Sequence, residues 1–198
     1  MGRQLFPYIL YSLFYIPFHI LLWSSDVVRI LGIDPGFVAT GYGIAETDGY
    51  RAKHVCHGVI RVSGVEIGEK LQCVFKGIGA ILAEHGPAEV AVERVFMHRN
   101  ADSALKLGQA RGAAITACAE YGLPVFEYTP NQIKQAVVGR GHAAKQQVQH
   151  MIRILLNLEE MPQADAADAL AVAICHGNLR EGLKRMPGVT GMVRGRLR

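Results

Sequence analysis

The sequence predicts an α/β protein built on a single mixed β-sheet. Residues 29–34 and 89–93 are continuous apolar runs, which are typical of strands buried on both faces of a parallel sheet. Residues 40–46 and 54–62 alternate between apolar and polar side chains, which predicts antiparallel strands. Longer segments with apolar residues at helical spacing lie between or after these runs, so we expect helices to flank the sheet.

The amino-terminal half is expected to begin with an antiparallel meander of three strands. A Thr-Asp-Gly turn at residues 47–49 joins the second strand to the third. Residues 66–84 carry apolar side chains at helical spacing, and the His-Gly-Pro sequence at 85–87 is a strong helix terminator. The strand at 89–93 therefore starts directly after a helix.

The carboxyl-terminal half is expected to be mostly helical. The helix predicted at 102–121 is rich in alanine and glycine, which permit close packing against a sheet or a second subunit. A strand at 125–129 leads into a helix at 130–138, with Thr129 as its cap and Pro130 as its first residue. Further helices are expected at 145–158 and 164–179, followed by a basic, disordered tail at 184–198.

The composition is that of one ordinary globular domain, which we place at residues 28–183. Half of the 198 residues are apolar and 19% are charged. The net charge of +4 is compatible with a polyanionic partner but does not require one. The four cysteines show neither a C-x-x-C pair nor zinc-ligand spacing, which predicts reduced thiols and a cytoplasmic location.

Residues 1–27 form a hydrophobic extension that does not fit the rest of the chain. Residues 5–23 carry no formal charge, and this stretch is near the length of about 20 residues that spans a bilayer. Two prolines and a histidine within it, and the lack of a convincing cleavage site, argue against an anchor or a secretory signal. We prefer a start codon set too far upstream, with Val27 or Val28 as the true start, and keep an anchor or a signal as alternatives.

Four carboxylates stand where the predicted elements can bring them together. Asp34 and Glu93 end the two buried strands, and open sheets of this kind bind ligands outside the carboxyl ends of their strands. Asp165 and Asp168 are three residues apart on a predicted helix, so they share one face. Ionised carboxylates in one cleft repel each other unless cations neutralise them, and oxygen ligands favour magnesium or manganese. The sequence therefore predicts a metal site.

Five segments together carry a family resemblance. They are GIDPG at 32–36, ERVFM at 93–97, NADSALKLGQARG at 100–112, KQQVQHM at 145–151 and ADAADAL at 164–170. In order and spacing, across residues 28–177, they closely resemble RuvC, the bacterial family of Holliday-junction resolvases. Any one segment alone is a weak signal, whereas five in order are specific. The resemblance implies a ribonuclease H-like fold, a five-stranded mixed sheet flanked by helices.

The resemblance also implies an activity and its partners. It implies a homodimeric endonuclease that cuts two strands of a four-way DNA junction in recombination and repair, leaving 5′-phosphate and 3′-hydroxyl ends. It implies that Asp34, Glu93, Asp165 and Asp168 are the catalytic acids that bind Mg²⁺ or Mn²⁺, two ions per site in the two-metal scheme. Family membership further implies recruitment by a branch-migration assembly of RuvA and RuvB.

Basic and aromatic residues near the acids are candidates for DNA contacts. By the resemblance, Phe96 stacks on a base, and Lys134 and Lys145 contact or neutralise the scissile region. Lys145 opens a helix, where a cation is unfavourable, which favours a catalytic role at a phosphate over a solvated charge. Burial of Phe96 in the core and solvation of either lysine are the alternatives. A phosphate-tracking surface is expected to include Arg99, Lys106 and Arg111.

Two other functions are compatible with parts of the sequence. Residues 33–36 followed by Thr40 and Gly41 resemble the first phosphate loop of actin-like ATPases and sugar kinases. The chain is too short for the second lobe that those proteins need, and it lacks their second Asp-x-Gly loop. A non-catalytic junction-binding protein would have no reason to keep four converging acids. We therefore expect a nuclease.

Overall fold

The computed structural model describes residues 27–94, 101–141, 143–184, 192–193 and 196–197. In chain order the elements are β1 (Val28–Asp34), β2 (Ala39–Thr47), β3 (Ala52–Arg61), α1 (Ile67–His85), β4 (Glu89–Glu93), α2 (Ala101–Glu120), β5 (Val125–Tyr128), α3 (Pro130–Val138), α4 (Lys145–Leu155), α5 (Ala164–Lys184), β6 (Met192–Val193) and β7 (Arg196–Leu197). The hydrophobic extension lies outside the described residues. Within the described ranges, no helix combines the length and apolarity needed to cross a bilayer.

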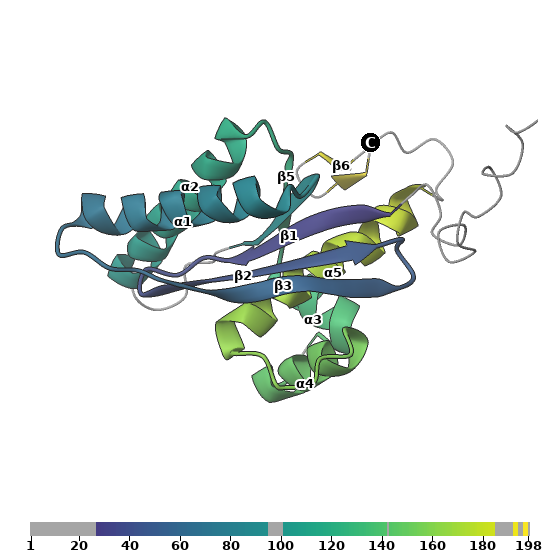
Figure 1. The fold of residues 1–198 in the computed structure, drawn as a ribbon. Helices are drawn as coiled ribbons and strands as arrows, with labels where there is room; N and C mark the ends of the chain where they lie inside the picture. The colour runs from purple at the N-terminus through teal and green to yellow at the C-terminus, as the bar shows by residue number, and fades with distance from the viewer. Residues whose placement is uncertain (1–26, 95–100, 142, 185–191, 194–195, 198) are drawn as a thin grey trace, which may run out of the picture.

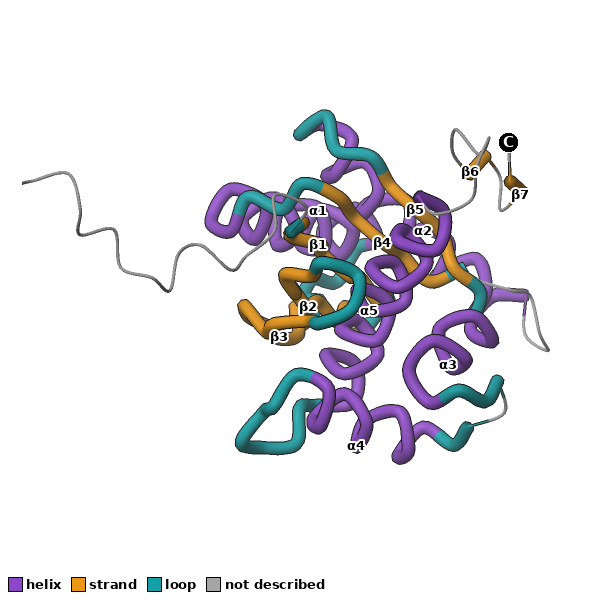
Figure 2. The backbone as a smooth tube through the Cα atoms, turned by 90° about the vertical axis from the view of Figure 1, so that its right-hand side faces the viewer, coloured by secondary structure: helices purple, strands orange, loops and turns teal. Residues whose placement is uncertain are grey.

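The first five strands form one mixed sheet in the order β3-β2-β1-β4-β5 (Figures 1 and 2). β1 pairs antiparallel with β2, and β2 with β3, which confirms the predicted meander. On the other side of β1, β4 and then β5 add in parallel. Because β1 and β4 are parallel neighbours, Asp34 and Glu93 lie side by side at the carboxyl ends of these two strands.

Helices cover both faces of the sheet (Figures 1 and 2). Alternate residues of β1 point to opposite faces, as the pleat requires. Leu31 belongs to the core beneath α1 and α2, and Ile30 to the core beneath α5. α3 and α4 pack outside α5, so residues 169–175 of α5 are buried between the sheet and these helices.

Glycines on the sheet allow α5 to approach it closely. A Cβ on Gly32 would lie 2.0 Å from the backbone oxygen of Ala169, and one on Gly41 would lie 2.0 Å from the backbone oxygen of Asp165. Real Cβ atoms do not approach backbone oxygens this closely, so a side chain at either position would push the helix away. The two glycines therefore fix how near the amino-terminal half of α5 lies to β1 and β2.

Some helix boundaries differ from those predicted. α4 ends at Leu155 and not at 158, because the chain turns at Asn157, whose φ of 49° is left-handed. α5 continues to Lys184, past the predicted end at 179. Within the expected tail, β6 and β7 pair antiparallel, and the remaining residues from 185 onward lie outside those described.

Candidate metal centre

Three aspartates from two elements meet at the carboxyl end of β1. Asp34 is the last residue of β1, and Asp165 and Asp168 lie in the first two turns of α5. Their carboxylate oxygens lie within 4.8 Å of one another, which is close enough to hold a metal ion. The close packing of α5 on the sheet glycines places its first turn beside β1. The structure thus brings Asp34 together with two acids that lie far from it in the sequence.

Glu93 lies beside this group without belonging to its tightest cluster. It ends β4, and it lines a cavity of about 220 Å³ together with Lys134, Lys145 and Asp168. Repulsion from Glu93 is the largest effect after burial in raising the pKa of Asp34. The four predicted acids therefore share one electrostatic environment.

Burial and mutual repulsion oppose the ionisation of these acids. Burial first, and then repulsion from the other three acids, raises the pKa of Asp34 to about 8. Burial likewise raises the pKa of Glu93 and of Asp168. A cation placed among them would reverse this effect, because it stabilises the ionised forms. The donor atoms are all carboxylate oxygens, so the cluster fits a hard divalent cation.

Lys145 reaches the acidic cluster from the first residue of α4. Its Nζ lies 2.7 Å from Oδ2 of Asp168, and this hydrogen bond raises the pKa of the lysine. The same contact lowers the pKa of Asp168, although burial has the larger, opposite effect. The lysine side chain is 58% exposed, so the ammonium contacts both the acids and solvent. It therefore lies on the solvent-facing side of the acidic cluster.

The residues predicted to contact DNA have different surroundings. Lys134 lines the same cavity as Glu93. Lys106 lies on the surface of α2, where its Nζ is 2.6 Å from Oδ2 of Asp102. Phe96 and Arg99 belong to the segment 95–100, which lies outside the described residues. Their proposed roles therefore stay predictions.

Arg111 has contacts that the sequence analysis did not anticipate. Its Nη2 lies 2.6 Å from Oε1 of Glu127, and its Nε donates to the backbone oxygen of Glu93 at 3.4 Å. Arg94 contacts the other oxygen of Glu127 at 3.2 Å. Glu127 thus ties β5 to α2 and to the residue after Glu93. Nothing in the sequence singles it out, because an acid in a short strand is ordinary.

A sheet of this order, with carboxylates gathered at the end of its central strand, is typical of metal-dependent nucleases of the ribonuclease H-like class. The model of the family described as "Crossover junction endodeoxyribonuclease RuvC" matches residues 30–176. The chain belongs to this RuvC family. The fold and the activity predicted from the sequence are confirmed by this membership.

Proteins that carry the same description as this family match nearly the whole domain of this chain. The protein of Hahella chejuensis is 51% identical over 172 residues, which are 87% of this chain and 100% of the relative. That of Aeromonas salmonicida is 55% identical over 170 residues, 85% of this chain and 98% of the relative.

Solved structures of junction resolvases have the same fold as this chain. "T. thermophilus RuvC in complex with Holliday junction substrate" has a TM-score of 0.74 and 36% identity, and the match covers 78% of this chain and 96% of that chain. The yeast mitochondrial Holliday junction resolvase Ydc2, with a TM-score of 0.58 and 14% identity over 79% of this chain and 82% of that chain, shares the fold.

Proposed function

We propose that this chain resolves four-way DNA junctions by hydrolysing one phosphodiester bond in each of two strands. The observation that carries the proposal is the convergence of Asp34, Asp165 and Asp168 at the edge of the sheet. The substrate is supported by the T. thermophilus relative, whose structure is described as a complex with Holliday junction substrate. Cleavage leaves 5′-phosphate and 3′-hydroxyl ends, which a ligase can rejoin.

We assign metal binding and catalysis to the four acids Asp34, Glu93, Asp165 and Asp168. Their oxygen-only donor set fits two Mg²⁺ ions, with Mn²⁺ as the other ion of suitable chemistry. Such ions lower the pKa of the attacking water and stabilise the departing oxygen. Asp34 is coupled both to Glu93 and to the two acids of α5, so it is the residue that bridges the two sides of the site.

Replacing Lys145 with glutamine is expected to slow cleavage by roughly 10²-fold while junction binding changes little. The ammonium already lies against Asp168 on the exposed side of the cluster, where it would stabilise charge that develops on the phosphate. Single-turnover rates in Mg²⁺, with binding measured in Ca²⁺, separate the two effects. Lys76→Gln is the matched control, because Lys76 is exposed on α1. An equal loss of cleavage rate in both variants would show that Lys145 has no special role.

Cutting of a synthetic four-way junction tests the proposal as a whole. In Mg²⁺ the full chain is expected to nick two strands symmetrically, to leave ends that ligase seals, and to spare a linear duplex of the same sequence. A chelator should abolish the reaction. Binding of the junction without cutting would instead make the chain a junction-binding protein, and equal cutting of the duplex would refute selectivity for the junction.

We further propose that the active form is a homodimer assembled through α2. Gly108 and Gly112 leave space beside the helix, since a Cβ on either would meet nothing within 4 Å. Leu105 lies on the same side at helical spacing and is 67% exposed. A second copy of this face would bury the leucine over the glycines.

Leu105→Glu is therefore expected to convert the dimer into a monomer. The introduced carboxylate would be buried without a partner in the interface, which weakens association by a few kcal/mol, on the order of 100-fold in the dissociation constant. Sedimentation equilibrium measures the change. Val65→Glu is the control, because Val65 is 87% exposed and lies before α1. An unchanged dimer in the Leu105 variant would place the interface elsewhere.

The remaining assignments follow from the same proposal. Phe96 stacks on a base at the crossover, which aromatic rings favour by about 1 to 3 kcal/mol per base. Lys134, in the cavity with Glu93, neutralises the scissile phosphate. A surface that follows the DNA backbone includes Arg99, Lys106 and Arg111. The chain works in the cytoplasm with a RuvA–RuvB assembly, in keeping with its four free cysteines.

A further inference from the structure

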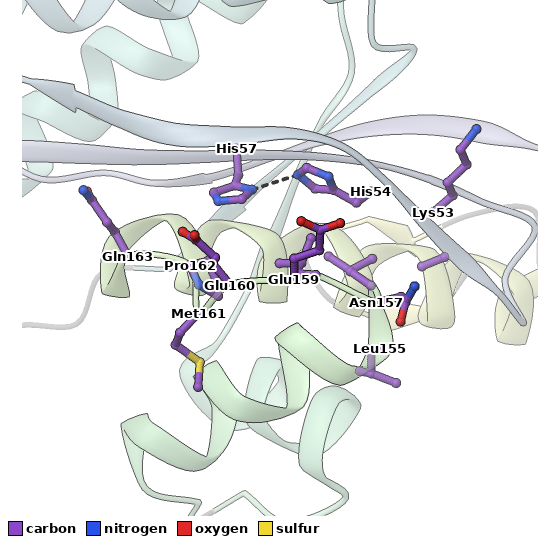
Figure 3. A pocket seen from close by; sticks show the side chains of 13 residues that line it. Lys53, His54, His57, Leu155, Asn157, Glu159, Glu160, Met161, Pro162 and Gln163 are labelled. Carbon is purple, nitrogen blue, oxygen red and sulfur yellow. Dashed lines mark hydrogen bonds between the residues drawn. The ribbon is translucent and has the colours of Figure 1, made fainter.

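Two histidines and two glutamates line a second cavity, to which the acidic cluster contributes no described lining residue. This cavity of about 790 Å³ separates β3 from the loop that joins α4 to α5 (Figure 3). His54 and His57 come from the β3 wall, and Glu159 and Glu160 from the loop. The cavity is larger than the one beside the catalytic acids, and the proposed nuclease mechanism does not use it.

The two histidines face the same cavity because of a bulge in β3. Residues three apart on a regular strand point to opposite faces of the sheet. The pairing of β2 with β3 shifts register between Ile44 and Ala45, which leaves Val55 as an extra residue on β3. Such a bulge re-aims the side chains around it. His54 and His57 therefore point the same way, with their rings close together (Figure 3).

One ring nitrogen of His54 faces one ring nitrogen of His57. Nε2 of His54 and Nδ1 of His57 are 2.8 Å apart and share a hydrogen bond. One nitrogen must donate and the other accept, so at least one ring is neutral. Burial lowers the pKa of both histidines. For both facing nitrogens to bind one ion, the ring that donates must carry its proton on its other nitrogen instead. Neutral imidazole is the form of histidine that binds metals.

The facing wall supplies oxygen donors. Glu159 and Glu160 extend from the loop toward the histidine rings (Figure 3). Two imidazole nitrogens with carboxylate oxygens make a donor set that suits zinc and its neighbours among the transition metals, unlike the all-oxygen set of the catalytic acids.

We propose that His54 and His57, with Glu159 and Glu160, form a binding site for one divalent transition-metal ion, of which Zn²⁺ is the best match. Two nitrogens bound to a tetrahedral zinc at about 2.0–2.1 Å lie roughly 3.3 Å apart. The present separation is 2.8 Å, so the rings need to part by about 0.5 Å and to turn until both lone pairs point at the ion. The flexible glutamate side chains close the site from the other wall.

Metal binding at this site would link two parts of the fold that are far apart in the sequence. One is β3, the outer strand of the sheet, and the other is the loop that ends at Gln163, directly before α5. A bound ion is expected to hold that loop on the sheet and to raise the melting temperature of the protein. The inference concerns binding alone and does not rest on the proposed nuclease function.

Calorimetric titration of the full chain with Zn²⁺, in excess Mg²⁺, tests the proposal. We expect one Zn²⁺ per chain, and affinity weakened roughly tenfold or more in His54→Ala and in His57→Ala. His150→Ala, which removes an exposed histidine from α4, should bind as the wild type does. Asp34→Asn should also retain the zinc, which separates this site from the acidic cluster. Absence of zinc binding, or equal binding after either histidine is removed, would overturn the proposal.

Two further measurements cover the case in which a histidine variant folds poorly. The double variant Glu159→Gln, Glu160→Gln changes only loop side chains and is expected to weaken Zn²⁺ binding without a change in the melting temperature of the metal-free protein. Co²⁺ bound to the wild type should give the visible absorption of a nitrogen-ligated tetrahedral ion. A Co²⁺ spectrum typical of oxygen ligands alone, or full affinity in the glutamine variant, would contradict the assignment.

Discussion

Replacing Asp34 with asparagine is expected to abolish junction cleavage and, at the same time, to make the metal-free protein more stable. Because we assign Asp34 to both sides of the proposed metal centre, its loss should lower the cleavage rate on the order of 10³-fold or more. The folded chain holds this carboxyl among three other acids in a half-buried site, which raises its pKa to about 8. Asparagine has nearly the same shape and cannot ionise, so the repulsion disappears.

The direction of the expected change in stability follows from how the stability of the wild type depends on pH. An unfolded aspartate releases its proton near pH 4, whereas Asp34 in the metal-free folded state holds its proton up to about pH 8. Between these values the folded state binds more protons than the unfolded state, so its stability falls as the pH rises. The loss reaches on the order of a few kcal/mol at pH 8, and the asparagine variant should not show it.

Thermal unfolding of both proteins in a chelator, across pH 5 to 9, measures the difference, and electrophoretic mobility in Ca²⁺ measures junction binding. Glu120→Gln is the control, since Glu120 is an exposed acid at the end of α2. Added Mg²⁺ should stabilise the wild type more than the asparagine variant. An asparagine variant that is less stable than the wild type at pH 8, or that no longer binds junctions, would show that Asp34 has a structural role.

Gly32→Ala is expected to lower both stability and cleavage, although the glycine lies outside the acidic cluster. A Cβ at this position would lie 2.0 Å from the backbone oxygen of Ala169 and 2.7 Å from the backbone nitrogen of Ala173. Backbone atoms of a buried helix cannot rotate away as a side chain can, so α5 must shift. Overpacking of this kind costs about 3 kcal/mol. The shift would also move Asp165 and Asp168, which α5 carries.

Urea unfolding and cleavage rates at a temperature where both proteins are folded measure the two effects. Gly68→Ala is the matched control, because a Cβ there meets nothing within 4 Å and alanine favours the helix. It should change stability by less than about 1 kcal/mol, in the stabilising direction. Equal stability of the two alanine variants would show that the helix is not held at the distance the structure gives.

The sheet and the acidic cluster are predictable from sequence because their signals are local or periodic. The apolar runs that end at Asp34 and Glu93 indicate parallel strands, and the spacing of Asp165 and Asp168 indicates one helix face. Contacts between elements give no such signal. The ion pairs of Glu127 with Arg94 and Arg111 join side chains from β5, the end of β4 and α2, which only the folded chain brings together.

The bulge in β3 is a second feature that the sequence does not reveal. An alternating strand predicts opposite faces for His54 and His57, whereas one extra residue at Val55 directs both to one side. The register of backbone hydrogen bonds decides this. Gly58 is a bulge signal within the same strand, but it lies three residues after Val55 and does not locate the extra residue. Sites that depend on such a shift are therefore invisible until a structure is available.

The contact between Lys145 and Asp168 means that the metal-free protein already carries a tethered counter-ion in its catalytic pocket. This ammonium offsets part of the repulsion while the chain folds without divalent ions. Its long stem and its partial exposure leave it free to exchange partners. A divalent ion held by Asp168 would replace this ammonium there and leave it to pair with an anion beside the site.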